Sequence, residues 1–252
     1  MIDEQSRDGV RIVKLAHGKV NAMDIELLDA ITHTFSALEK EGEGPVVLTG
    51  NGSAFSAGVD LRRVVREGRP YLGRFLPALS QAFRAVFECP RPVIGAINGH
   101  AIAGGCVLAC ACDHRIMASS NARIGVPELY VGVPFPAVAL EIVRYAVAPA
   151  HLQEIVYSGR TFSTEDALAR GLVDEAVEAE GVLERALEQS QRYATVRSAT
   201  YALTKRQLQA EAVARYRRGE MNDNAEVDAL WLSNETIPAI EDYLERTLGK
   251  KR

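Results

Sequence analysis

Short apolar runs alternate with helically spaced apolar residues along the first two thirds of the chain. Val10–Leu15 and the apolar run at residues 45–49 predict strands, and Gly50-Asn51-Gly52 predicts a turn after the second. Between them, Asp24 is suited to cap a helix. The apolar residues of this helix recur every three or four positions: Leu28, Ile31, Phe35 and Leu38. This alternation of strand and helix patterns predicts an α/β domain.

Residues 92–112 contain no Asp, Glu, Lys or Arg. The stretch is long enough to span a bilayer, but Asn98-Gly99-His100 places a turn signal at its centre. We therefore predict two buried elements instead of a membrane helix: a strand at residues 92–97 and a helix at residues 105–112. The helix is apolar on every side and should be buried all round. A further strand is predicted at residues 115–118.

The C-terminal part of the chain has a different pattern. Ser163 and Asp166 are spaced as in a capping box that opens a short helix, and residues 172–177 predict a last strand. After about Gly181 only helical patterns continue. We therefore expect an α/β core in residues 1–195 and a helical C-terminal region in residues 196–252.

Length, charge and cysteine usage narrow the class of protein. A chain of 252 residues suits one large domain, and its net charge of −4 argues against nucleic-acid binding. The first residues carry charges, and no apolar signal region follows them. Three of the four cysteines lie in the charge-free stretch, and their spacing matches no zinc pattern. We expect reduced thiols, no metal site and a cytoplasmic protein.

Two glycine-rich segments, residues 55–61 and 98–106, lead from strand patterns into helical patterns. The first N–H groups of a helix have no partner within the helix, and glycine lets a ligand approach the backbone closely. If the two turns face each other, the N–H groups of Val59 and Gly104 can form an oxyanion hole. The alternative is that these glycines only allow tight turns and close helix packing, and the spacing by itself favours that interpretation.

A third segment, residues 125–132, contains Glu128, the one charged residue between residues 124 and 140. Apolar surroundings raise the pKa of a carboxyl group, and enzymes use this effect to bring a general base toward neutral pH. The alternative is an exposed carboxylate on a loop, which is the commoner situation for a single glutamate.

Together, these three segments resemble the crotonase (enoyl-CoA hydratase/isomerase) superfamily. The resemblance runs in order from residues 18–22 to residues 171–174, and residues 104–115 are its most specific part. It implies an α/β fold built as a spiral of ββα turns, with a helical C-terminal region that forms trimers or hexamers. It also implies an acyl-CoA thioester substrate and no metal or redox cofactor. From the net charge and the interrupted apolar stretch we expect no nucleic-acid and no membrane partner.

The resemblance assigns roles to individual residues. It implies that the N–H groups of Val59 and Gly104 form the oxyanion hole and that Glu128 is the catalytic base. The residues that it implies for binding the CoA thioester are Lys19, Val20, Ala22, Ala57, Val59, Asp60, Leu61, Arg62 and Gly104. We expect residues 64–87 and Trp231 to shape the acyl pocket.

The carboxylates favour one branch of the superfamily. Its hydratases use two glutamates, and the matching positions here are Val107 and Glu128. Valine cannot hold a proton, so the pattern resembles the Δ3,Δ2-enoyl-CoA isomerases, which use one glutamate in fatty acid metabolism. Dienoyl-CoA isomerases place an aspartate where this chain has Pro136. The alternatives are an enoyl-CoA hydratase or another crotonase-type lyase, and a noncatalytic member that binds acyl-CoA or RNA.

Overall fold

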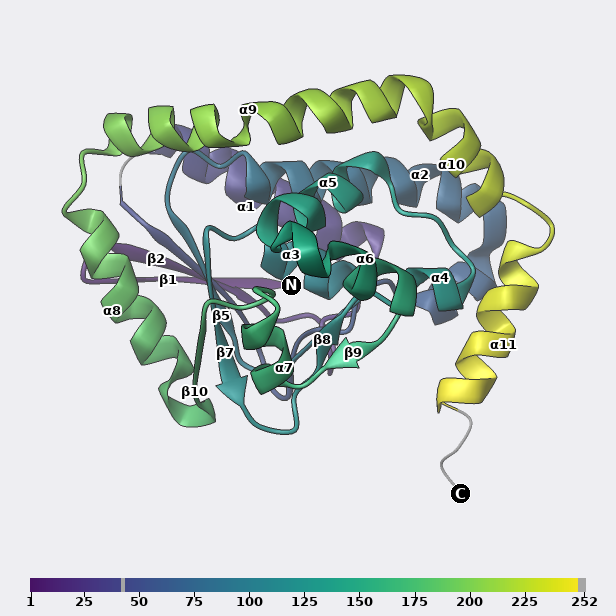
Figure 1. Ribbon diagram of the computed structural model, residues 1–252, viewed down its shortest axis with the longest axis horizontal. Helices are drawn as coiled ribbons and strands as arrows, with labels where there is room; N and C mark the ends of the chain where they lie inside the picture. The colour runs from purple at the N-terminus through teal and green to yellow at the C-terminus, as the bar shows by residue number, and fades with distance from the viewer. Residues whose placement is uncertain (42–43, 249–252) are drawn as a thin grey trace.

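The computed structural model describes residues 1–41 and 44–248 and has an α/β fold with two sheets (Figure 1). In the larger sheet β1 pairs antiparallel with β2, and the remaining neighbours are parallel. Its strands, in spatial order, are β1 (Ile2–Arg7), β2 (Val10–Leu15), β3 (Val46–Gly50), β5 (Val93–Ile97), β7 (His114–Ser119) and β10 (Glu175–Glu178).

A smaller sheet lies beside the larger one and is made of very short strands. In spatial order they are β4 (Ala54–Ser56), β6 (His100–Ile102), β8 (Ile124–Gly125) and β9 (Thr161–Phe162). The chain visits the two sheets in turn, since β3 is followed by β4, β5 by β6, and β7 by β8. A helix follows each of these pairs, so the predicted α/β spiral of ββα turns is confirmed.

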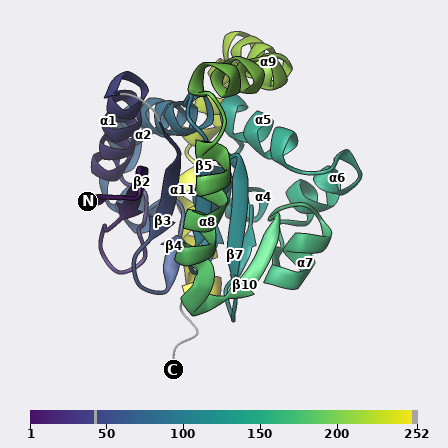
Figure 2. The same ribbon diagram turned by 90° about the vertical axis from the view of Figure 1, so that its left-hand side faces the viewer.

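The helices cover both faces of the larger sheet. In chain order they are α1 (Ile25–Glu41), α2 (Leu61–Phe87), α3 (Gly104–Cys110), α4 (Glu128–Val131), α5 (Ala137–Ala146), α6 (Pro149–Ser158), α7 (Thr164–Ala169), α8 (Val182–Ala194), α9 (Ser198–Asn222), α10 (Asn224–Trp231) and α11 (Thr236–Leu248). Figure 2 shows α8 in front of the sheet, where it packs on β3, β5 and β7, with α1 and α2 on one side of it.

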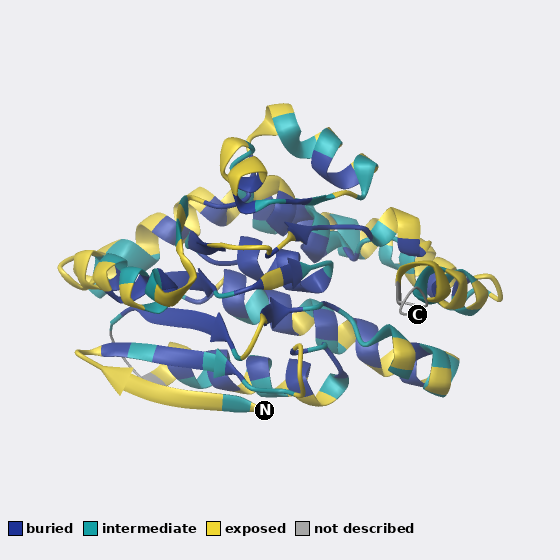
Figure 3. Ribbon diagram, turned by 90° about the horizontal axis from the view of Figure 1, so that it is seen from below, coloured by how far each residue is buried: buried dark blue, intermediate teal, exposed yellow. Residues whose placement is uncertain are grey.

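Burial explains the apolar runs in the sequence. Strands β3 and β5 are buried at every position because helices cover both faces of the sheet. Strand β1, in contrast, lies at the edge and is exposed along most of its length (Figure 3). Every residue of α3 is buried, as its apolar sequence predicts.

Several predicted elements are confirmed, and others were missed. Asp24 and Ser163 do cap α1 and α7, accepting hydrogen bonds from the N–H groups of Leu27 and Asp166. The last predicted strand was placed too early, because β10 begins at Glu175. The sequence analysis did not predict β1, whose residues are mostly polar, or the strands of the smaller sheet. Nor did it predict α2, which consists of two helical parts that meet at a kink at Gly68, where φ is 65°.

The long helix α9 runs along one edge of the molecule and packs on α5 (Figure 1). A buried ion pair attaches it to the core, since Lys205 Nζ lies 2.8 Å from Asp113 Oδ2. The same carboxylate oxygen accepts the N–H of Val93 at 2.8 Å. Within the described residues, no helix is long and apolar enough to cross a membrane. The expected division of the chain after residue 195 falls just before α9 and stays a prediction.

The buried pair predicts an asymmetric response to mutation. Asp113→Ala leaves the ammonium group of Lys205 buried without its counter-charge, so the free energy of unfolding should fall by about 3–5 kcal/mol. Lys205→Met, by comparison, leaves Asp113 with the Val93 N–H and should cost less. Urea denaturation measures both variants. Equal, small losses of under about 1 kcal/mol would show that the pair does not hold α9 in place.

Candidate active site

Two turns of the smaller sheet lie against each other. The first joins β4 to α2 and the second joins β6 to α3. At Gly58, where φ is +78°, a Cβ atom would lie 2.5 Å from the carbonyl oxygen of Ile102 and 3.1 Å from the nitrogen of Gly104. Only glycine permits this approach. Ala103, which precedes Gly104, also has a positive φ of 52°, an uncommon conformation for alanine.

Each turn contributes to the pocket lining a residue whose backbone N–H group has no partner. Beside these residues, Asp60 N–H bonds to the Met23 carbonyl and Ala103 N–H to the Gly125 carbonyl. Across the described residues, the N–H groups of Val59 and Gly104 have no hydrogen-bond acceptor. Both residues line the same pocket. Two unpaired donors in one apolar pocket can stabilise an oxygen atom on which negative charge develops.

The pocket is almost entirely apolar and has about 620 Å³ of empty space, part of it open to solvent. Leu79 and Phe83 from α2 line it, as does Trp231, so both parts of the chain expected to shape an acyl pocket do reach this one. The remaining apolar lining residues include Val131, Val133, Pro134, Phe135, Pro136 and Ala139.

Glu128 is the first residue of α4, and its carboxyl group lies in the wall of this pocket. The residue as a whole is half-buried, but Oε2 is fully enclosed and has no hydrogen-bond partner in the part of the chain that the structure describes. Loss of hydration raises the pKa of Glu128 from 4.5 to about 8. The structure therefore places Glu128 with one carboxyl oxygen enclosed and unpaired, and the exposed-loop interpretation is wrong.

Val107 is buried in the same pocket wall, at the position where a second carboxylate was considered. Among the described lining residues, Glu128 has the only carboxyl side chain, and none is a lysine or arginine. Elsewhere in the described ranges there is no group of three or more His, Cys, Asp or Glu side chains that could hold a metal ion. All four cysteines are free thiols in buried positions.

The residues implied for CoA binding fall into two groups. Ala57, Val59, Leu61 and Gly104 line the pocket. The others lie outside it, although segment 19–22 runs beside the first turn and Val20 accepts the N–H of Ala57 at 2.9 Å. Lys19, Val20 and Arg62 are exposed and Ala22 is half-buried. Asp60 has a structural task, since its carboxylate accepts the N–H of Arg63 at 3.0 Å and caps α2.

The sequence analysis missed Tyr243, which reaches the pocket from α11. Burial raises its pKa, and the charge of Glu128 raises it further. Trp231, from α10, is nearly fully buried and donates its indole N–H to the carbonyl of Pro134 at 3.0 Å. No local pattern could have found Tyr243, because it lies more than 100 residues after the glycine-rich turns.

Comparisons with known proteins agree with this geometry. The family model for enoyl-CoA hydratase/isomerase matches residues 5–247. The chain belongs to this family, the crotonases, and is an acyl-CoA enzyme of the family.

Individual relatives include both isomerases and hydratases. The mitochondrial enoyl-CoA delta isomerase 1 of Rattus norvegicus is 25% identical over 258 aligned positions, which cover 100% of this chain and 88% of the rat protein. The structure of human mitochondrial delta3-delta2-enoyl-CoA isomerase superposes with a TM-score of 0.93 at 23% identity, covering 100% of this chain and 99% of that one. An enoyl-CoA hydratase from Mycobacterium marinum superposes with a TM-score of 0.81 at 30% identity, covering 90% and 99%.

The close approach of the two turns predicts the effect of a single methyl group. Gly58→Ala should push the turns apart and lower kcat/KM by at least about 10²-fold, because small displacements of reacting groups are that costly. The matched control is Gly68→Ala, which has a similar φ of +65° but nothing within 4 Å of the added Cβ. The control should lose about 1–3 kcal/mol of stability, because φ 65° with ψ −153° is a conformation essentially restricted to glycine, and should keep its activity. Equal activity in the two variants would contradict this role of Gly58.

Proposed function

We propose that this enzyme shifts the double bond of a 3-enoyl-CoA to give the 2-enoyl-CoA, with Glu128 as the single catalytic base. The observation that carries the proposal is one enclosed, unpaired carboxyl group in an apolar pocket that also holds two unpaired N–H donors. Transfer of a proton between two carbons needs no water, and a dry pocket suits it.

The proposed mechanism uses all three of these groups. The thioester carbonyl oxygen accepts hydrogen bonds from the N–H groups of Val59 and Gly104. Glu128 removes a proton from C2, and the electrons move into a dienolate whose oxygen carries the negative charge. The two donors stabilise that charge, and each can contribute about 3–4 kcal/mol in the transition state. Glu128 then returns the proton to C4, and the double bond forms between C2 and C3.

Binding energy from the CoA portion holds the acyl group in place during this transfer. In the proposal, Lys19, Val20, Ala22, Asp60 and Arg62 lie along the path of CoA outside the pocket. The exposed cationic side chains of Lys19 and Arg62 suit a phosphate-bearing ligand. The expected trimer or hexamer and the cytoplasmic location stay predictions.

Hydration is the alternative reaction, and similarity to the Mycobacterium marinum hydratase supports it. It requires a water molecule to be oriented and deprotonated while C2 gains a proton. Val107 offers no proton acceptor for that work, and the neighbouring wall is apolar. We therefore rank hydration, and other crotonase-type lyase reactions, behind isomerisation. A noncatalytic role in binding acyl-CoA or RNA gives no reason for an enclosed carboxyl group beside two free donors.

The test compares 3-enoyl-CoA and 2-enoyl-CoA of matched chain length, with products identified by mass and double-bond position. We expect isomerisation, with hydration at least about 10²-fold slower because a second acid–base group is missing. Glu128→Gln should lower isomerisation by about 10²–10⁴-fold and leave CoA thioester binding intact. Hydration as fast as isomerisation would favour the hydratase assignment, and an active Glu128→Gln variant would show that another group is the base.

The raised pKa of Glu128 predicts a pH dependence. The base must be ionised, so kcat/KM should rise with pH through an apparent pKa of about 8, the value in the free enzyme. The pKa of Glu128 in the folded protein lies above its ordinary value of 4.5. Protonation of Glu128 therefore stabilises the fold, and this stabilisation is complete below pH 4.5. This stabilisation is lost as the pH rises through about 8. Glu128→Gln should lack this part of the pH dependence of unfolding. A kcat/KM profile that is flat across this range would contradict the burial of the base.

A further inference from the structure

The orientation of the Val59 N–H group depends on a segment far from it in sequence. Residue Met23, just before α1, pairs with the turn on both sides of Val59. Its N–H donates to the carbonyl of Gly58 at 2.7 Å, and its carbonyl accepts the N–H of Asp60 at 3.0 Å. Val59 is thus left with a free N–H between two paired neighbours. Any movement of the segment around Met23 also moves this donor.

On the side that faces β4, neutral hydrogen bonds hold this segment in place. Asn21 is fully buried, has a positive φ of 49°, and donates from Nδ2 to the carbonyl of Phe55 at 3.0 Å. Its Oδ1 accepts the N–H of His17 at 2.9 Å. Ser56 Oγ donates to the carbonyl of Asn21 at 2.8 Å. These bonds join the segment to β4, but they do not reach α2.

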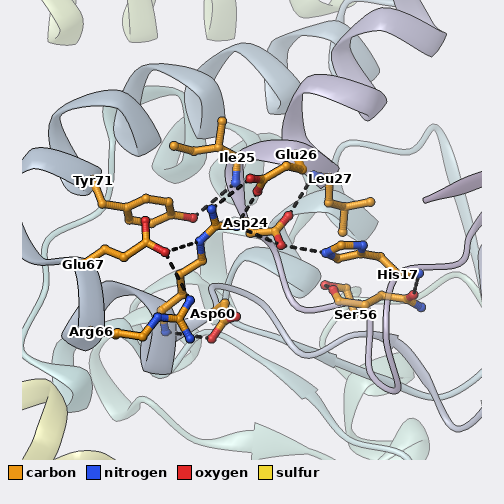
Figure 4. Close-up of polar contacts among 12 residues, drawn as sticks. His17, Asp24, Ile25, Glu26, Leu27, Ser56, Asp60, Arg66, Glu67 and Tyr71 are labelled. Atoms are coloured by element: carbon orange, nitrogen blue, oxygen red, sulfur yellow. Dashed lines mark hydrogen bonds and ion pairs between the residues drawn. The ribbon is translucent and has the colours of Figure 1, made fainter.

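On the side that faces α2, contacts between charged side chains hold this segment in place (Figure 4). Asp24 caps α1 through the N–H of Leu27 at 2.9 Å, and its other oxygen lies 2.7 Å from His17 Nε2. That same oxygen is 3.3 Å from Arg63 Nη1, which belongs to the first turn of α2. Asp24 is only 8% exposed, so solvent screens this contact weakly. The Asp24–Arg63 pair therefore joins the N-terminal ends of α1 and α2.

Arg63 is fixed in this position from several directions. It bonds to both carboxylate oxygens of Glu26, with one of these bonds at 2.8 Å, and to Glu67 at 2.9 Å. Its guanidinium carbon lies 4.9 Å from the centre of the Tyr71 ring. The Arg63 cation lowers the pKa of Glu26 to about 2. A planar guanidinium can serve several acceptors at once, which a lysine ammonium group on a flexible stem does less well.

We propose that Asp24 and Arg63 are positioning residues for the oxyanion donor of Val59. The ion pair keeps the segment around Met23 against the turn that carries Val59, and so fixes the orientation of the Val59 N–H group. This inference rests on the proposed role of Val59. Negative charge on the thioester oxygen develops only in the enolate, so loss of the pair should weaken enolate stabilisation much more than ground-state binding.

Two variants weaken the ion pair between Asp24 and Arg63 and leave the cap of α1 in place. Asp24→Asn keeps the side-chain shape and an oxygen for the Leu27 N–H, since asparagine is also a good helix cap, but removes the negative charge. Arg63→Lys keeps the positive charge and loses the planar fork. The matched control is Glu184→Gln, which breaks a two-bond pair with Arg7, at 2.6 and 2.9 Å, away from the pocket.

The measurement compares two ligands that differ in charge on the thioester oxygen. Butyryl-CoA represents the ground state, and acetoacetyl-CoA, which ionises to an enolate with its own ultraviolet absorbance, represents the charged state. In both variants we expect enolate affinity and kcat to fall by about 10- to 100-fold, the cost of a misplaced catalytic group. Butyryl-CoA affinity should stay within about twofold, and the control should match wild type in every measurement.

The outcomes separate the positioning role from the proposed reaction. Enolate affinity at the wild-type level in both folded variants would show that the pair does not position Val59, whatever reaction the enzyme catalyses. Equal losses for the two ligands would also overturn the proposal, because they indicate general disruption of the site. A wild-type enzyme that binds the enolate tightly, loses this in the variants and yet does not isomerise 3-enoyl-CoA would support the positioning role and reject the isomerase assignment.

Discussion

The candidate active site depends on two backbone N–H groups, those of Val59 and Gly104, that stay unpaired beside an apolar pocket. An unpaired donor in a buried site costs free energy, so the surrounding structure has to prevent the backbone from relaxing toward an acceptor. Gly58 and the positive φ of Ala103 bring the two turns together, and pairing with Met23 fixes the first of them. Each ββα unit adds one strand to each of the two sheets. This arrangement holds the two glycine-rich turns next to each other.

The candidate base depends on the C-terminal helices in the same way. Glu128 lies on a helix of four residues, which is too short to be stable without tertiary contacts. A Cβ on Gly132, at the end of that helix, would lie 3.1 Å from the Cβ of Ala239 in α11. Trp231 from α10 anchors the following loop through Pro134. The C-terminal helices are therefore part of the site, and they also remove the water that would lower the pKa of the carboxyl group.

Similarity to both isomerases and hydratases follows from this arrangement. In the proposed mechanism the fold supplies a pocket for a thioester and two N–H donors for its oxygen, and both reactions need these. The choice between reactions depends on a few side chains in the pocket, where Val107 stands in place of a second carboxylate. Family membership accordingly establishes an acyl-CoA enzyme, and the identity of a single wall residue supports the finer assignment.

The sequence by itself determined the elements whose signals are local. The buried strands, the capped start of α1 at Asp24, the apolar helix α3 and the glycine-rich turns could all be predicted, because each depends on residues within a few positions. The tertiary structure decided what distant segments do to one another. It enclosed the carboxyl group of Glu128, brought Tyr243 into the pocket and placed Arg63 against Asp24. Burial and electrostatic pairing depend on three-dimensional neighbours, and no local pattern in the chain encodes them.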